Sequence, residues 1–150
     1  MESAITARTG MMTPTALYAL EVMSVMVQKL LWLSLAGACG TVSRYALCEL
    51  AGKVKGGPFP LGTFLVNILG SFLFGLVYVL AQHKFNMSHE TRIIILTGFM
   101  GAFTTFSALA FETASMLKSS QWILAAGNVS AQITLGIAAL VAGVLIGRLL

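Results

Sequence analysis

The chain has 150 residues, of which 57% are hydrophobic and only 9% are charged, and its mean hydropathy is +0.89. These proportions exclude an ordinary soluble domain and predict an integral membrane protein with one domain. Nine Lys and Arg residues against five acidic residues give a net charge of +4. This charge suits loops near anionic lipid headgroups better than nucleic-acid binding, because the sequence has no basic run or basic-aromatic patch.

Residues 1–28 are an N-terminal extension whose status the sequence leaves open. Residues 16–27 are apolar and favour a helix, but they include Glu21 and are too few to span a bilayer. A translation start nearer Met26, a leader peptide and an amphipathic helix on the membrane surface are the alternatives. We expect residues 29–150 to form the functional domain.

Four apolar segments follow, each long enough to cross a membrane. The first ends near Arg44, where an arginine either anchors the helix at the headgroups or assists the entry of ions. The sequence therefore predicts an all-α membrane protein with four transmembrane helices. Their expected ranges are residues 30–50, 61–81, 93–116 and 122–147.

The second segment has polar residues on one face. Thr63, Asn67 and Ser71 recur every four positions, so their side chains line the same side of a helix. Asn67 is either a hydrogen-bonding contact between helices or part of a polar pathway. We favour the pathway, because three polar side chains share the face.

The fourth segment combines a polar pair with a row of small residues. Asn128 and Gln132 lie four positions apart and share a face. Further along, Ala139, Gly143 and Gly147 form a small-residue ridge of the kind that lets two membrane helices approach closely. We expect this ridge to serve packing.

The third segment is interrupted by small, polar and aromatic residues from Gly98 to Ser107. Glycines permit unusual backbone angles, and the hydroxyls of Thr104 and Thr105 can cap freed backbone groups. Within hydrocarbon, non-helical backbone survives only where protein, water or an ion satisfies it. We predict a helix broken in the middle of the membrane at residues 101–105. The alternative is a continuous helix whose small residues pack against a neighbour.

Positive charge is nearly equal on the two sides of such a chain, because the nine Lys and Arg residues divide five to four between them. Orientation in the membrane follows the asymmetry of Lys and Arg, so this chain could insert both ways. Two copies in opposite orientations would be related by a two-fold axis in the membrane plane. We expect an antiparallel dual-topology dimer.

Side chains for metal or enzyme chemistry are missing from the pattern. His83 and His89 lie in a loop with only Glu90 as a possible partner, so we expect no metal site built from side chains. No nucleophile has an adjacent base, neither histidine lies in a span, and there is no phosphate-binding glycine loop. We therefore do not expect an enzyme.

Three motifs follow one another along the chain with specific spacing. They are Gly37-x-x-Gly40-x-x-x-Arg44-Tyr45, Gly62-Thr63-x-x-x-Asn67, and Gly98-Phe99-x-Gly101-x-x-Thr104-Thr105-Phe106-Ser107 with Glu112 after it. This set resembles the Fluc/CrcB family of fluoride channels, over about residue 29 to the C-terminus. The resemblance implies a multi-pass protein of the cell (inner) membrane. It also implies an antiparallel homodimer with two fluoride pores and a structural sodium ion (Na+) on the two-fold axis.

The resemblance also assigns roles to residues. Backbone carbonyls that correspond to Gly101 and Thr104 hold the sodium ion in the family, and two from each subunit make a cage of oxygens suited to a hard cation. By the same matching Thr63, Asn67, Ser107, Asn128 and Gln132 would line the fluoride pore. Phe106 would contact fluoride, because the edge of a phenyl ring carries the positive end of its quadrupole. Arg44 and Glu112 are vestibule or anchor residues, and Glu112 is alternatively a simple surface charge.

The sequence departs from the family pattern after Ser107. Leu109 stands where a second aromatic fluoride contact is usual, and Ala108 and Ala110 replace hydroxyl residues. On the fourth helix Asn128 and Gln132 stand where tyrosine and serine are commoner. These differences bear on the conduction rate and selectivity, and they leave a cage of backbone carbonyls untouched.

The function that these observations favour is a passive fluoride-selective channel that exports cytoplasmic fluoride. Fluoride that enters as neutral HF ionises inside, and an outward leak needs no ATP, in keeping with the missing phosphate-binding loop. One alternative is a non-conducting partner subunit of a heterodimeric channel, which Ala108 and Leu109 suggest. The other is a small proton-coupled drug exporter, for which Glu21 would be the only candidate carboxylate.

Overall fold

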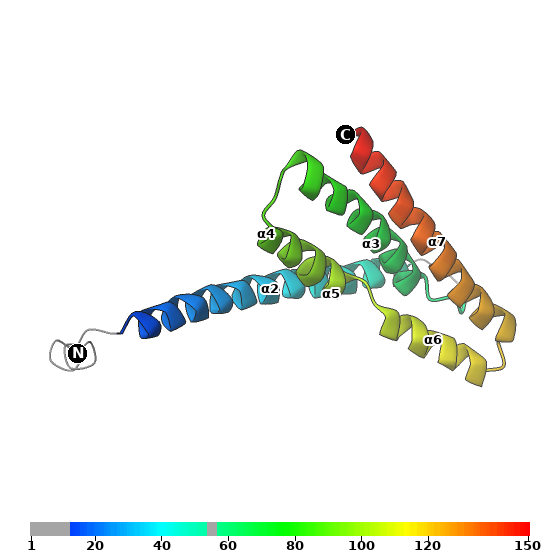
Figure 1. Cartoon of the computed structure of the whole chain (residues 1–150). Helices are drawn as coiled ribbons and strands as arrows, with labels where there is room; N and C mark the ends of the chain where they lie inside the picture. The colour runs from blue at the N-terminus through cyan, green and yellow to red at the C-terminus, as the bar shows by residue number, and fades with distance from the viewer. Residues whose placement is uncertain (1–12, 54–56) are drawn as a thin grey trace.

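The computed structural model describes residues 13–53 and 57–150, and within these ranges the regular elements are helices (Figure 1). Two of them, η1 and η2, are π-helical turns, in which an amide bonds to the carbonyl five residues earlier. In chain order the elements are α2 (Pro14–Gly52), α3 (Leu61–Val79), η1 (Leu80–Lys84), α4 (His89–Ile93), η2 (Ile94–Met100), α5 (Gly101–Phe103), α6 (Phe106–Lys118) and α7 (Trp122–Leu149).

Four stretches of these helices are long and apolar enough to cross a membrane. They are Pro14–Gly52, Leu61–Lys84, His89–Lys118 and Trp122–Leu149. The prediction of an all-α membrane protein with four transmembrane helices is thereby confirmed.

The first helix starts earlier than we expected from the sequence. α2 begins at Pro14 and not near residue 30, so the expected boundary after residue 28 falls inside one continuous helix. Thr13 caps its first turn, because its hydroxyl accepts a hydrogen bond from the amide of Ala16 (3.2 Å), and Pro14 suits the first helical position. The expected extension also includes residues 1–12, which lie outside the described residues.

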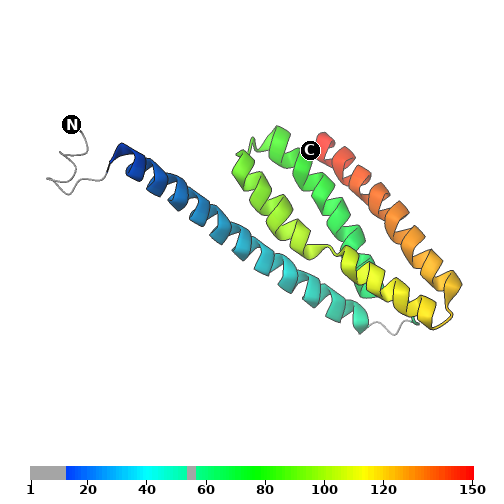
Figure 2. The ribbon, with the colours of Figure 1, turned by 60° about the horizontal axis from the view of Figure 1, so that its bottom comes forward.

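α2 is longer than a membrane requires. Its 39 residues correspond to about 58 Å, roughly twice the thickness of the hydrocarbon core. Figures 1 and 2 show its N-terminal part reaching beyond the other helices, and nearly all side chains of residues 14–28 are exposed. The part of α2 that contacts the bundle is therefore its C-terminal half.

α3 and α7 run parallel and pack through glycines along one half of their contact. A Cβ on Gly143 would collide with the carbonyl oxygen of Phe72, and a Cβ on Gly75 would collide with that of Leu140. A Cβ on Gly147 would lie 3.2 Å from the carbonyl oxygen of Leu76. The expected packing role of the small-residue ridge on α7 is confirmed at its two glycines.

α2 reaches the third span through glycines as well. A Cβ on Gly40 would collide with the carbonyl oxygen of Phe99, and a Cβ on Gly98 would lie 2.9 Å from the Cβ of Ala36. The first and third sequence motifs thus touch each other directly. This contact holds α2 against η2 and α5.

Between α5 and α6 the backbone leaves the helical conformation. Thr104 has φ −83° and ψ 158°, and Thr105 has φ −151° and ψ 117°, so both are extended. We call Thr104 and Thr105 the extended pair. It is shorter than the range of residues 101–105 named from the sequence, because the helix continues through Phe103.

Candidate functional site

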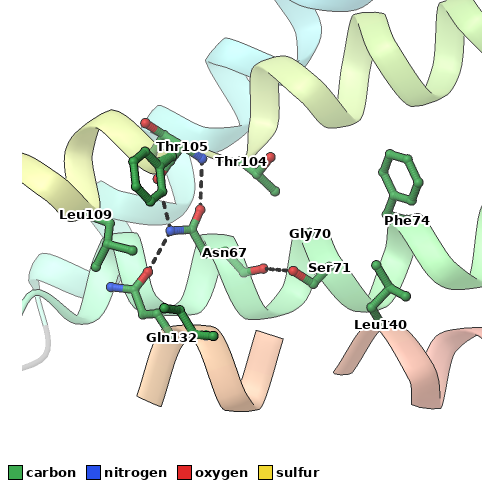
Figure 3. Close-up of a pocket in the computed structure, with 11 residues that line it drawn as sticks. Asn67, Gly70, Ser71, Phe74, Thr104, Thr105, Leu109, Gln132 and Leu140 are labelled. Carbon is green, nitrogen blue, oxygen red and sulfur yellow. Dashed lines mark hydrogen bonds between the residues drawn. The ribbon is translucent and has the colours of Figure 1, made fainter. Parts of the chain in front are cut away.

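One side chain from α3 satisfies the backbone of the extended pair. The Oδ1 atom of Asn67 accepts a hydrogen bond from the amide of Thr105 (2.8 Å), and its Nδ2 atom donates to the carbonyl oxygen of Thr105 (3.1 Å) (Figure 3). Both backbone polar groups of Thr105 therefore find a partner although this residue has left the helical conformation. The amide of Asn67 replaces two backbone hydrogen bonds at the interruption.

The threonine hydroxyls bind backbone groups beside the interruption, and that of Thr105 caps a freed amide as the sequence predicted. The Oγ1 atom of Thr105 accepts from the amide of Ala108 (3.2 Å) and caps the start of α6, and it also pairs with the hydroxyl of Ser107 (3.0 Å). The hydroxyl of Thr104 donates to the carbonyl oxygen of Met100 (3.1 Å), which also accepts the amide of Thr104 (3.1 Å). A side chain thus caps the start of α6, whereas the Thr104 hydroxyl reinforces a carbonyl that the helix already satisfies.

A chain of amides leads from the extended pair into α7. The Nδ2 atom of Asn67 also donates to Oε1 of Gln132 (2.6 Å), and Nε2 of Gln132 donates to Oδ1 of Asn128 (2.9 Å). The Nδ2 atom of Asn128 donates in turn to the hydroxyl of Thr113 on α6 (3.2 Å). We call Asn67, Gln132 and Asn128 the amide network. It ties α3, α6 and α7 together with interhelical hydrogen bonds, each worth about 0.6–2 kcal/mol in membranes.

A groove opens beside the extended pair, and we call it the first groove. Asn67, Ser71 and Gln132 contribute polar groups to its wall (Figure 3). Phe106 and Leu109 contribute apolar ones. The Phe106 side chain is 78% exposed, whereas that of Leu109 is only 6% exposed. The first groove therefore offers amide and hydroxyl groups next to an exposed phenyl ring.

A second groove lies across Thr105 from the first. Its lining includes Arg44, Thr63 and Ser107, together with Thr105 itself, which lines both grooves. The hydroxyl of Thr63 donates to Oε1 of Glu112, which is half-buried. Glu112, in the middle of α6, is therefore bonded to α3 and is not a simple surface charge.

Known proteins resemble this chain over most of its length. The profile of the family described as CrcB-like protein, Camphor Resistance (CrcB), matches residues 31–144. The chain belongs to the CrcB family. The expected resemblance is confirmed.

Three relatives are named fluoride-specific ion channel FluC. The one from Nitrosococcus oceani is 49% identical over 125 residues, which are 83% of this chain and 100% of the relative. The one from Solidesulfovibrio magneticus is 47% identical over 125 residues, with the same two shares. The one from Nitratidesulfovibrio vulgaris (strain DSM 19637 / Miyazaki F) is 43% identical over 123 residues, which are 82% of this chain and 99% of the relative. Their names are those of channels, in keeping with the expectation that this chain is not an enzyme.

The three CrcB motifs of this chain meet around the extended pair. Gly40 of the first motif packs on Phe99 of the third, and Asn67 of the second motif binds Thr105. Arg44, also from the first motif, lines the second groove. Motifs far apart in the sequence therefore converge on one place in this CrcB chain.

The structure separates the predicted site residues into groups. Asn128 is fully buried (0% exposed) and lies behind Gln132, on neither groove. Gly101 lies exposed on α5, one turn before the extended pair. The first groove holds Asn67, Thr104, Phe106, Leu109 and Gln132, and the second groove holds Arg44, Thr63 and Ser107, with Glu112 bonded to Thr63.

Sequence reasoning missed Thr113 as a member of this CrcB site. It accepts the last hydrogen bond of the amide network, from Asn128. One more threonine on an apolar helix carries no signal of its own. Its partner on α7 becomes apparent only in the packed structure.

Proposed function

We propose that this chain is a passive fluoride-selective channel that lets cytoplasmic fluoride leave through the membrane. The observation that carries the proposal is the first groove, where uncharged donors and a phenyl ring lie together in a CrcB chain. The name of its relatives supports fluoride as the ion.

The chemistry of the first groove suits a small anion that must bind and leave quickly. Conduction needs groups that replace the water around the ion without holding it firmly. The spare amide N–H of Gln132 can do this, whereas the hydroxyl proton of Ser71 is donated to the carbonyl oxygen of Asn67, and the edge of Phe106 adds a weakly positive surface. No Lys or Arg lines this groove among the residues that the structure describes, so the anion meets no fixed positive charge there.

An antiparallel second copy would complete the pore. The first groove is open on one side in a single chain, and Phe106 stands exposed at its rim. Polar groups in a groove that is open to hydrocarbon favour a protein partner that covers them, because lipid tails offer no hydrogen bonds. The near-equal division of Lys and Arg supports insertion of the partner in the opposite orientation. The extended pair would then interrupt the third span near the middle of the membrane.

A structural sodium ion, bound and not transported, fits the backbone around the extended pair. In a continuous helix the amide of Thr105 would bond to the carbonyl of Gly101, but here it donates to Asn67. The amide of Ala108 would likewise bond to the carbonyl of Thr104, but it donates to the hydroxyl of Thr105. Two carbonyls that lack their helical donors are suitable ligands for a hard cation, and a second copy would supply two more. These oxygens would coordinate the ion, which would satisfy them and hold the two copies together.

Fluoride efflux from liposomes that contain the purified chain tests the proposal. We expect rapid loss of fluoride and almost no loss of chloride under the same gradient. A well-folded dimer that releases no fluoride would contradict the homodimeric channel and favour the non-conducting partner subunit, which Leu109 and Ala108 suggested. Release of fluoride and chloride at equal rates would contradict selectivity.

A further inference from the structure

The backbone of Thr105 fixes which way the amide of Asn67 faces. A backbone N–H can only donate and a carbonyl oxygen can only accept. Asn67 must therefore present its oxygen to the amide of Thr105 (2.8 Å) and its nitrogen to the carbonyl of Thr105 (3.1 Å). The usual ambiguity between oxygen and nitrogen in a side-chain amide does not arise here.

This orientation passes along the whole amide network. Because the Nδ2 atom of Asn67 donates toward Gln132, Gln132 must accept this hydrogen bond with its Oε1 atom (2.6 Å). The nitrogen of Gln132 then faces the oxygen of Asn128 (2.9 Å), and the nitrogen of Asn128 faces the hydroxyl of Thr113 (3.2 Å). From side chain to side chain, the amides thus donate in one direction, away from the extended pair.

The side-chain amides of Asn67 and Gln132 differ in how many of their N–H groups already have a protein acceptor. The Nδ2 atom of Asn67 has two N–H groups, and both have protein acceptors, the carbonyl of Thr105 and Oε1 of Gln132. The Nε2 atom of Gln132 donates to one acceptor among the described residues, which leaves one N–H for another partner. Figure 3 shows this nitrogen on the side of Gln132 away from Asn67, and Gln132 lines the first groove.

We infer that Asn67 is a positioning residue, which holds the extended pair and orients Gln132, and that the N–H offered to the anion in the first groove comes from Gln132. This inference rests on the proposed fluoride channel. Asn67 could donate to fluoride only by giving up the carbonyl of Thr105 or the oxygen of Gln132, and an abandoned buried acceptor is costly. Asn128 has a spare N–H as well, but it is fully buried and lines neither groove.

The test separates the two roles with paired variants. Gln132→Met keeps the length of the side chain and removes its amide, while both bonds between Asn67 and Thr105 can remain. We expect fluoride efflux to fall at least about tenfold, the loss of one interaction worth about 1.4 kcal/mol in the barrier. Hydrogen exchange at the amide of Thr105, measured by NMR on threonine-labelled protein, should stay at the wild-type rate.

Asn67→Ala should change both readouts, because it removes the partner of the Thr105 amide. We expect faster exchange at that amide together with loss of efflux. Ile137→Met is the control on the same helix, since Ile137 is 62% exposed, lines neither groove and has no amide. It should leave both readouts at wild-type values.

Wild-type efflux in Gln132→Met would overturn the donor role of Gln132. Unchanged exchange at Thr105 in Asn67→Ala would overturn the positioning role of Asn67, and this readout needs no fluoride flux. Should Gln132→Met fail to assemble, Gln132→Leu removes the amide in its place, and wild-type efflux in that well-folded variant would equally overturn the donor role. A wild-type chain that conducts no fluoride would instead defeat the proposed function.

Discussion

The two halves of the α3–α7 contact are built on opposite principles. Toward the C-terminal ends of these helices Gly75, Gly143 and Gly147 bring the two backbones together without polar side chains. Toward the N-terminal ends Asn67 and Gln132 join the same helices through side-chain amides. The glycine half can only pack, whereas the amide half places oriented donors beside a groove. One pair of helices therefore supplies both the scaffold and the candidate pore wall.

The largest effect is expected from a side chain added in the glycine half. Gly143→Val places a Cβ against the carbonyl oxygen of Phe72, a contact that backbone movement alone can relieve. Overpacking of this kind costs at least 1–3 kcal/mol, so we expect α3 and α7 to separate and the chain to aggregate or be lost on expression. Yield and size-exclusion profile measure this.

Gly127→Val is its matched control on the same helix, because nothing lies within 4 Å of a Cβ placed there. Its yield should be close to that of the wild type. Equal behaviour of the two variants would contradict the close packing of the glycine half.

Removal of sodium should have the next largest effect. If the carbonyls of Gly101 and Thr104 depend on a cation, replacing sodium with a bulky organic cation should abolish fluoride efflux and weaken the dimer. Efflux and the oligomeric state are measured before and after exchange of the cation. Full activity after exhaustive removal would mean that these carbonyls have other partners.

A phenyl ring at position 109, beside the amide half, should change fluoride efflux less than the removal of sodium does. Leu109 lines the first groove, so the larger side chain of Leu109→Phe can extend into it beside Phe106. We expect fluoride efflux to be retained or to rise up to about tenfold, because a second ring edge faces the ion. Collapse of the dimer would show that Leu109, which is buried, serves packing alone.

The smallest effect is expected from removal of residues 1–28. The side chains of residues 14–28 are nearly all exposed, and 125 residues of this chain cover the whole relative from Nitrosococcus oceani. Fluoride efflux of the shortened chain should stay within about twofold of wild type, well under 1 kcal/mol in the barrier. Loss of efflux from a folded product would give the extension a role in conduction.

The sequence predicted what depends on local pattern. Apolar length predicted the four spans, small residues in α7 predicted the glycine contact, and the hydroxyl of Thr105 predicted the cap at the start of α6. The start of α2 at Pro14 was not predicted, because Glu21 and the short apolar stretch of residues 16–27 argued against a longer helix there.

What the sequence could not supply is the identity of partners across helices. Periodicity placed Asn67 and Gln132 on polar faces, but only the parallel packing of α3 and α7 brings these two amides within hydrogen-bonding distance. The bond from Asn67 to the backbone of Thr105 likewise depends on where α5 ends. Side-chain partners separated by tens of residues follow from tertiary packing and not from spacing.

The central claim is that the first groove is the path of fluoride, and Phe106 tests it most directly. Phe106→Leu removes the exposed ring at the rim of this groove. Phe111→Leu is the control, because Phe111 is an exposed ring on the same helix but lines only the second groove. In liposomes, we predict that fluoride efflux falls at least about tenfold in the first variant and stays near wild type in the second. Wild-type efflux in Phe106→Leu, with the dimer intact, would contradict the claim.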